Sequence, residues 1–205
     1  AAFVLDEVTS GWRYGFPGAA PGLGIEPDIA VYAKAMSNGI PCAAIVGRAS
    51  VMDAANESFI SSSYWTDGIG PAAALACIGK MQRLGVQARV WALGERMQQA
   101  LRDLAVRHPA LNIKVGGQPC APSFAFGLGD DSAAAKALMI RGMLHRQFLF
   151  SSQLYAMWPH NEAMIADMLS ALDEVLVGLD ELLERGTLRA VAGPTVLPAG
   201  FARRA

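Results

Sequence analysis

Two charged residues, Asp6 and Lys34, follow apolar runs and stand where a chemical site is expected. Asp6 comes directly after residues 2–5, and Lys34 ends residues 28–34; both runs are typical of strands buried in a parallel sheet. Because ligands of open α/β sheets bind at the carboxyl ends of the strands, we expect both side chains to face one pocket. A carboxylate and an amine that converge suit pyridoxal phosphate (PLP). The amine forms a Schiff base with its aldehyde, and the carboxylate keeps the pyridine nitrogen protonated.

The same residues fit two other interpretations. An apolar run followed by Asp6 and Glu7 is also the Walker B pattern of nucleotide hydrolases, in which the acids bind Mg²⁺ and position water. The partner of that pattern, a G-x-x-x-x-G-K-[ST] loop, does not occur in the 205 residues. In the remaining interpretation Asp6 caps a loop, Lys34 is a solvated strand end, and the chain is a non-catalytic remnant with a scaffold role.

Composition excludes several classes of protein. Hydrophobic residues make up 53% of the chain, which predicts a folded core, and the net charge of −1 gives no electrostatic reason to expect a nucleic-acid or membrane-surface partner. No apolar run is long enough to span a membrane. The three cysteines are widely spaced and odd in number, so we expect free thiols and a cytoplasmic protein. The three histidines lack metal-ligand spacing, and His108, before Pro109, is expected to cap carbonyls at a helix end.

The first part of the chain carries the elements that must position Asp6 and Lys34. Between the two strands, residues 10–27 form a long Gly- and Pro-rich loop, and loops of this length in compact domains are often functional. A third strand is predicted over residues 42–47. Helices are predicted over residues 51–58, 71–84 and 86–107, with Gly85 as the break between the last two.

After residue 110 the pattern changes to that of a small α+β domain. Strands are predicted over residues 111–116, 122–128 and 148–150, and helices over residues 132–147 and 162–184. Asn161 is a good N-cap for the last helix, and Gly186 closes it. The sequence therefore predicts a first part over residues 1–84, a connecting helix with a small domain over residues 85–186, and an irregular tail over residues 187–205.

The wider pattern around Asp6 and Lys34 resembles the class III aminotransferases, which depend on PLP. Those enzymes carry a D-E-V-x-x-G-[FW]-R strand end, a P-D segment, and a lysine followed by a turn and a proline. The 28-residue step from Asp6 to Lys34 is similar to theirs, and Thr66 stands five residues before Pro71, as their phosphate-binding threonine does. The matching segments are LDEVTSGWR at 5–13, PD at 27–28, AKA at 33–35 and GIP at 39–41.

The resemblance implies a role for each matching residue. Lys34 is the catalytic Schiff-base lysine and the proton shuttle. Asp6 pairs with the pyridine nitrogen of PLP, and Val8 packs against a face of the ring. Thr66 reaches the phosphate of the cofactor in the neighbouring subunit, so that a homodimer shares its active sites. Glu7 holds the loop rather than the cofactor.

The resemblance also implies the fold and the reaction. The expected fold is α/β, fold type I: the C-terminal part of the large, mainly parallel-sheet domain plus a small α+β domain. The expected reaction transfers an amino group from an amino donor to a carbonyl substrate. Residues 159–162 (PHNE) look like those of glutamate-1-semialdehyde aminomutases, which shift the amino group within one molecule. The phosphate-cradling loop of the family lies upstream of these motifs, so we expect a fragment that is inactive alone.

Overall fold

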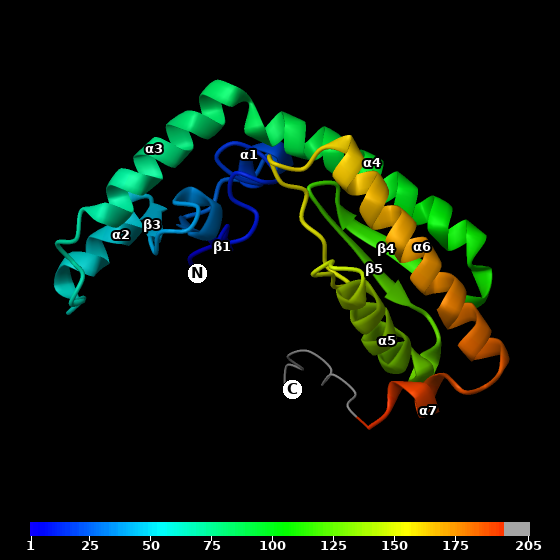
Figure 1. The fold of residues 1–205 in the computed structure, drawn as a ribbon. Coiled ribbons are helices and arrows are strands. Elements are labelled where there is room, and N and C mark those ends of the chain that lie inside the picture. Colours follow the sequence, from blue (N-terminus) through cyan, green and yellow to red (C-terminus); the bar gives the residue numbers. More distant parts are fainter. Residues whose placement is uncertain (195–205) are drawn as a thin grey trace. The chain divides into compact units, whose positions relative to one another are not determined.

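The computed structural model describes residues 1–194, and their contacts divide the chain into two units (Figure 1). Unit 1 is Ala1–Trp91 and unit 2 is Ala92–Ala205. The division falls inside helix α4 (Val86–Arg107), a little after Gly85, where the sequence places the boundary of the first part. Unit 1 carries Asp6 and Lys34, whereas most of the buried side chains belong to unit 2.

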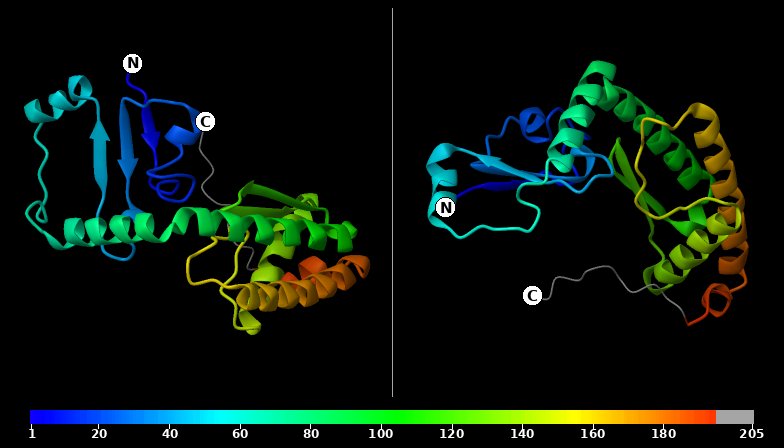
Figure 2. Two further views of the ribbon diagram at one scale, coloured as in Figure 1. Left: turned by 90° about the horizontal axis from the view of Figure 1, so that it is seen from above. Right: turned by 60° about the vertical axis from the view of Figure 1, so that its left-hand side comes forward.

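A three-stranded sheet forms the centre of unit 1, with its strands side by side in the left view of Figure 2. Strand β1 (Val4–Asp6) pairs in parallel with β2 (Ile29–Tyr32), and β2 pairs in antiparallel fashion with β3 (Ala44–Gly47). All three strands lie close to their predicted positions. Asp6 stands opposite Val31, so the carboxyl ends of β1 and β2 meet at the same edge of the sheet.

Helices surround this sheet with different degrees of burial. Instead of the single helix predicted over residues 51–58, the chain forms two short segments, α2 (Ala49–Met52) and the 3₁₀ turn η2 (Asp53–Glu57). Neither segment buries a residue, so no packed face supports a longer helix. The longer α3 (Ile69–Leu84) ends at Gly85, whose φ of +61° is a left-handed conformation that glycine adopts without strain.

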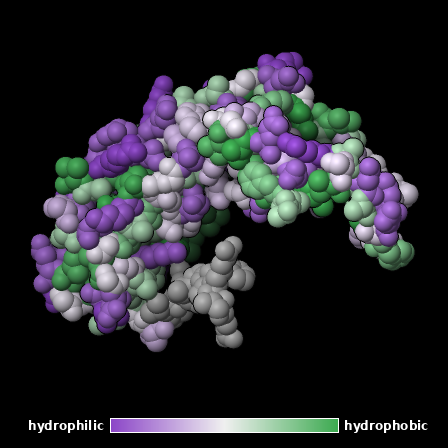
Figure 3. Space-filling view, turned by 180° about the vertical axis from the view of Figure 1, so that it is seen from behind, coloured by the Kyte–Doolittle hydropathy of each residue, from purple (hydrophilic) through white to green (hydrophobic). Residues whose placement is uncertain are grey.

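Unit 1 leaves many large apolar side chains exposed. Hydrophobic residues reach the surface among hydrophilic ones in the space-filling view of Figure 3. The most exposed ones in unit 1 include Ile45, Phe59, Tyr64, Trp65 and Leu75. Within residues 1–194, no helix combines the length and the apolar character that crossing a membrane requires.

Unit 2 packs helices on a β-hairpin of β4 (Ile113–Gln118) and β5 (Ala121–Phe126). Helix α5 (Ser132–His145) contacts β5 and packs against α6 (Glu162–Glu184). Helix α4 approaches the hairpin turn so closely that a Cβ on Gly94 would come within 1.8 Å of the Pro119 carbonyl oxygen. The predicted apolar stripe of α4 is buried in unit 2 at Leu93, Met97, Leu101 and Leu104.

The strand predicted over residues 148–150 is wrong. These residues adopt no regular structure, and Leu149 is almost fully exposed. The chain reaches the edge of β5 only afterwards, where Leu154 N donates to Pro122 O at 2.9 Å. The ring of Phe150 packs against that of Phe124, with centroids 5.9 Å apart. The apolar residues 148–150 therefore serve side-chain packing and do not form a strand.

The prediction of an irregular tail over residues 187–205 is wrong in its first part. This part contains helix α7 (Leu188–Ala192), which contacts α5. Leu188 and Ala192 are buried on one face of this helix, and five residues are too few for a visible helical period. Residues 195–205 of the predicted tail lie outside the described residues.

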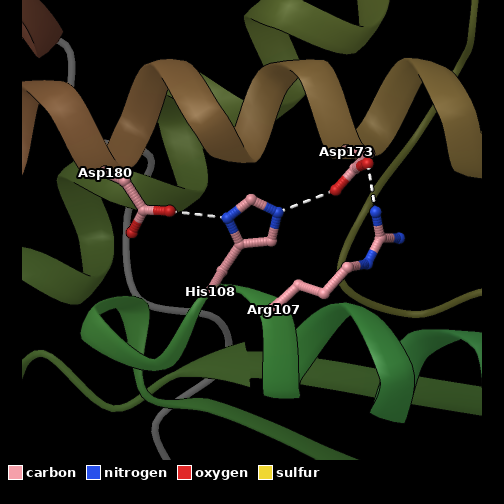
Figure 4. Close-up of polar contacts among 4 residues, drawn as sticks. All are labelled: Arg107, His108, Asp173 and Asp180. Atoms are coloured by element: carbon pink, nitrogen blue, oxygen red, sulfur yellow. Dashed lines mark hydrogen bonds and ion pairs between the residues drawn. The ribbon is translucent and has the colours of Figure 1, made fainter.

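A cluster of charged groups around the buried His108 joins the end of α4 to α6 in unit 2 (Figure 4). His108 is 5% exposed, and its ring nitrogens Nδ1 and Nε2 lie 2.5 Å from Asp180 Oδ2 and 2.8 Å from Asp173 Oδ1. Arg107 also pairs with Asp173. The side chain of His108 therefore binds carboxylates of another helix, and the prediction that it caps carbonyls is wrong.

Candidate functional site

Lys34 lies just beyond the carboxyl end of β2, at the edge where β1 also ends. It begins the 3₁₀ turn η1 (Lys34–Met36), and its φ is +47°. A residue other than glycine in this left-handed region costs on the order of 1–3 kcal/mol, and such residues cluster at functional sites. Met36, two residues on, is buried against Trp12 and Ala74, and this packing holds the turn in place.

The Lys34 amine reaches the loop that follows Asp6. Its Nζ donates a hydrogen bond to Thr9 Oγ1 at 2.7 Å. Lys34 is exposed, and Thr9 stands three residues after Asp6. The structure therefore brings the amine to the β1 loop, and its partner there is a neutral hydroxyl. Sequence reasoning missed Thr9; the signal it offered was a hydroxyl residue inside the D-E-V-x-x-G segment.

Asp6 is exposed at the end of β1. Its Oδ1 accepts a hydrogen bond from the backbone N–H of Val8 at 2.9 Å, which turns the side chain along the loop. An ionised carboxylate has about four acceptor positions, so this single contact leaves it able to accept a further donor. Val8 itself is half-buried.

Glu7 is fully buried beside these exposed groups. Its carboxylate accepts from the Ser10 hydroxyl and from the backbone N–H groups of Ala19 and Ala20, at 2.7 and 3.1 Å. A Cβ on Gly18 would come within 2.5 Å of this carboxylate. Glu7 therefore holds the Gly- and Pro-rich loop in place, as the resemblance implies. A Walker B acid must face Mg²⁺ and water, and this one faces the interior.

The charge of Glu7 also acts on the aromatic neighbours of the site. Burial, and secondly the nearby Glu7 carboxylate, raise the pKa of Tyr32 above its ordinary value. The ring of Tyr32 lies against Trp12, with centroids 5.1 Å apart. Trp12 is buried and Tyr32 half-buried, whereas Asp6 and Lys34 are exposed.

Thr66 is the remaining site residue that the resemblance implies. It is exposed in the turn before α3, and within residues 1–194 it makes no hydrogen bond to Asp6 or Lys34. The next residue, Asp67, turns its Oδ1 to the backbone N–H of Ile69 at 3.0 Å and so caps the start of α3. Asp6, Val8 and Lys34 thus lie at or just beyond the carboxyl ends of β1 and β2, whereas Thr66 precedes α3.

These groups fit PLP in their donor chemistry. An exposed primary amine and an exposed carboxylate with spare acceptor capacity stand at one edge of a parallel strand pair, and both are groups that the cofactor uses. The Lys34 amine suits the aldehyde of PLP, and the Asp6 carboxylate suits its ring nitrogen.

Comparison with known proteins agrees with this chemistry. Residues 1–176 match a family model described as Aminotransferase class-III. The chain is 33% identical over 136 residues to the 2'-deamino-2'-hydroxyneamine transaminase of Streptomyces kanamyceticus, covering 65% of the chain and 34% of that protein. It is 27% identical over 186 residues to the 3-aminobutyryl-CoA aminotransferase of Cloacimonas acidaminovorans (strain Evry), covering 88% of the chain and 44% of that protein.

Solved structures show the same fold. The FumI protein of Sphingopyxis sp. MTA144, in its PLP internal aldimine form, superposes with a TM-score of 0.82 at 23% identity, over 94% of this chain and 47% of that one. A transaminase with PLP bound gives a TM-score of 0.78 at 24% identity, over 90% of this chain and 46% of that one. The chain thus spans about a third to a half of the length of the relatives it matches.

Proposed function

The chain belongs to the class III aminotransferases, with the fold of PLP-dependent fold-type-I transaminases, and from this premise we propose that the complete protein transfers amino groups from an amino donor to a carbonyl substrate. One observation carries the proposal. The parallel pairing of β1 and β2 places Asp6 and Lys34 at one edge of the sheet, and the amine of Lys34 reaches the loop after Asp6.

Each residue has a task in this proposal. Lys34 supplies the amine that attaches the cofactor and moves a proton as a general base. Asp6 accepts a hydrogen bond from the protonated ring nitrogen, and Val8 packs against a face of the ring. Glu7 keeps the loop that carries both of them in place. PLP supplies an electron sink when it is bound.

Thr66 acts across a subunit interface in this proposal. Its exposed hydroxyl donates to a cofactor phosphate of a second copy of the protein, as the family resemblance implies. The exposed apolar side chains around it, Phe59, Tyr64 and Trp65, support a covering partner. We propose a homodimer, and a cytoplasmic location on the basis of the three free cysteines.

Transfer between two molecules is favoured over an intramolecular shift. The sequence cue for an aminomutase was residues 159–162, and two of these residues have structural roles. Asn161 Oδ1 caps α6 by accepting from Met164 N at 2.9 Å, and Glu162 pairs with Arg96. Helix capping explains this segment without a specific substrate, so it adds no support for the shift.

The test is borohydride fixation of PLP in the complete protein. We expect fixation on Lys34, and we expect Lys34→Ala to remove it and to lower turnover at least about 100-fold, since positioned acid–base groups contribute that much. Asp6→Asn is expected to keep the fixation but to lose turnover. Lys80→Ala, at an exposed lysine of α3, is the matched control and should change neither. Fixed PLP and normal turnover in Lys34→Ala would refute the proposal.

A further inference from the structure

The position of the Lys34 amine depends on one side-chain contact. An exposed lysine carries a charged group on a flexible four-carbon stem and usually has no fixed place. Here Nζ lies 2.7 Å from Thr9 Oγ1, a normal hydrogen-bond distance. The acceptor is a hydroxyl, although a carboxylate, Asp6, stands three residues earlier in the same loop.

The Thr9 hydroxyl is held by a rigid loop. Gly11 N donates to Glu7 O at 2.9 Å, and Tyr14 N donates to Ser10 O at 2.9 Å, so the chain on both sides of Thr9 forms closed turns. The Ser10 hydroxyl is bound by the buried Glu7 carboxylate. The buried Glu7 carboxylate therefore fixes the part of the loop that carries Thr9.

The backbone of Lys34 is equally constrained. Its φ of +47° is fixed within a turn in which Met36 N donates to Ala33 O and Asn38 N donates to Lys34 O, each at 3.0 Å. Both backbones are held, so the side chains of Thr9 and Lys34 extend from fixed positions, and their contact joins the loop after β1 to the turn after β2.

We propose that Thr9 is a positioning residue that holds the free Lys34 amine away from the Asp6 carboxylate. The proposal rests on the proposed function, in which both charged groups must be available to one cofactor. A hydrogen bond between two charged groups is about twice as strong as one between neutral groups. An amine bound to Asp6 would therefore block that carboxylate, and the amine itself would be bound more tightly than it is by Thr9. A neutral hydroxyl orders the amine without forming that ion pair.

The experiment measures how fast Lys34 reacts in the PLP-free form of the complete protein. Reductive methylation with formaldehyde and cyanoborohydride labels lysines, and mass spectrometry gives the rate at Lys34 relative to Lys80, Lys114 and Lys136 in the same molecule. In Thr9→Val the amine turns to Asp6, and we expect relative labelling of Lys34 to fall about two- to fivefold, the range of an exposed ion pair. Thr9→Ser keeps the hydroxyl and should label like the wild type.

The double variant Thr9→Val with Asp6→Asn separates this role from a general disturbance of the loop. Its labelling should return to the wild-type ratio, because no carboxylate is left to capture the amine. Unchanged labelling in Thr9→Val, or a decrease that Asp6→Asn does not reverse, would overturn the inference. The proposed function fails on a different result, namely the absence of borohydride-fixed PLP on Lys34 of the wild type.

Discussion

In unit 1 the charged groups Asp6 and Lys34 are exposed and each has a neutral partner, whereas in unit 2 His108 is buried between two carboxylates (Figure 4). Each ring nitrogen of His108 contacts the carboxylate of a different aspartate of α6. The charged groups around His108 therefore contact one another and hold α4 to α6. Asp6 and Lys34 remain open to a ligand.

This difference predicts where substitutions act. Changes in the His108 cluster should lower stability and leave the chemistry of Lys34 intact in the protein that stays folded. Changes at Asp6 or Lys34 should affect turnover, and at Lys34 also cofactor attachment, with little loss of stability. A change at Glu7 should affect both stability and ligand attachment, because Glu7 is a buried carboxylate within the exposed site.

The largest expected effect is that of His108→Ala. Removing the ring takes a buried side chain, with its contacts to Asp173 and Asp180, from between α4 and α6, and truncating a buried, hydrogen-bonded side chain costs about 3 kcal/mol of unfolding free energy. Urea denaturation measures this loss. His145→Ala, at an exposed histidine of α5, is the matched control and should stay within about 0.5 kcal/mol. An equal change in both variants would break the contrast between buried and exposed charges.

A smaller effect is expected for Glu7→Gln. Glu7 is buried like His108, but it lies beside the exposed Asp6 in unit 1. The side-chain NH₂ replaces an acceptor that now faces N–H or O–H donors, so about 1–3 kcal/mol of unfolding free energy should be lost. Hydrogen exchange should also rise in residues 10–27, and PLP attachment should weaken. Glu26→Gln, at an exposed acid of the same loop, should change none of these. Stability lost without faster exchange in the loop would show that Glu7 does not anchor it.

How far the sequence predicted these features depends on how local their causes are. Helices α4 and α6 occupy the predicted residues, because an apolar stripe, the Asn161 cap and the glycines at 85 and 186 lie within or beside them. The edge shared by Asp6 and Lys34 follows from two apolar strands that pair in parallel.

Other features depend on contacts between distant segments. His108 meets carboxylates 65 and 72 residues further along the chain, and no local pattern near Pro109 reveals them. The Thr9 contact with Lys34 spans 25 residues and depends on a left-handed backbone at a lysine. The triplet at 148–150 suggested a strand because hydrophobicity alone does not distinguish a packing anchor from a strand.

The smallest of the three effects is the pH dependence of the His108 cluster. Hydrogen bonding from His108 lowers the pKa of Asp173 below its ordinary value of 3.8; burial opposes it with the next largest effect, and Arg107 adds to the lowering. A carboxyl group whose pKa is lower in the folded state adds stability above its unfolded pKa and loses it as the pH falls through the folded one. Asp173→Asn should therefore be less stable than the wild type at pH 6, and the gap should narrow below about pH 4. Because Asp173 is partly exposed, solvent screening keeps this gap smaller than the loss in His108→Ala.

Urea denaturation between pH 6 and pH 3 measures this difference in stability. Asp167→Asn, at an exposed acid of the same helix, is the control. A gap that stays constant with pH would mean that Asp173 acts through its shape and not through its charge.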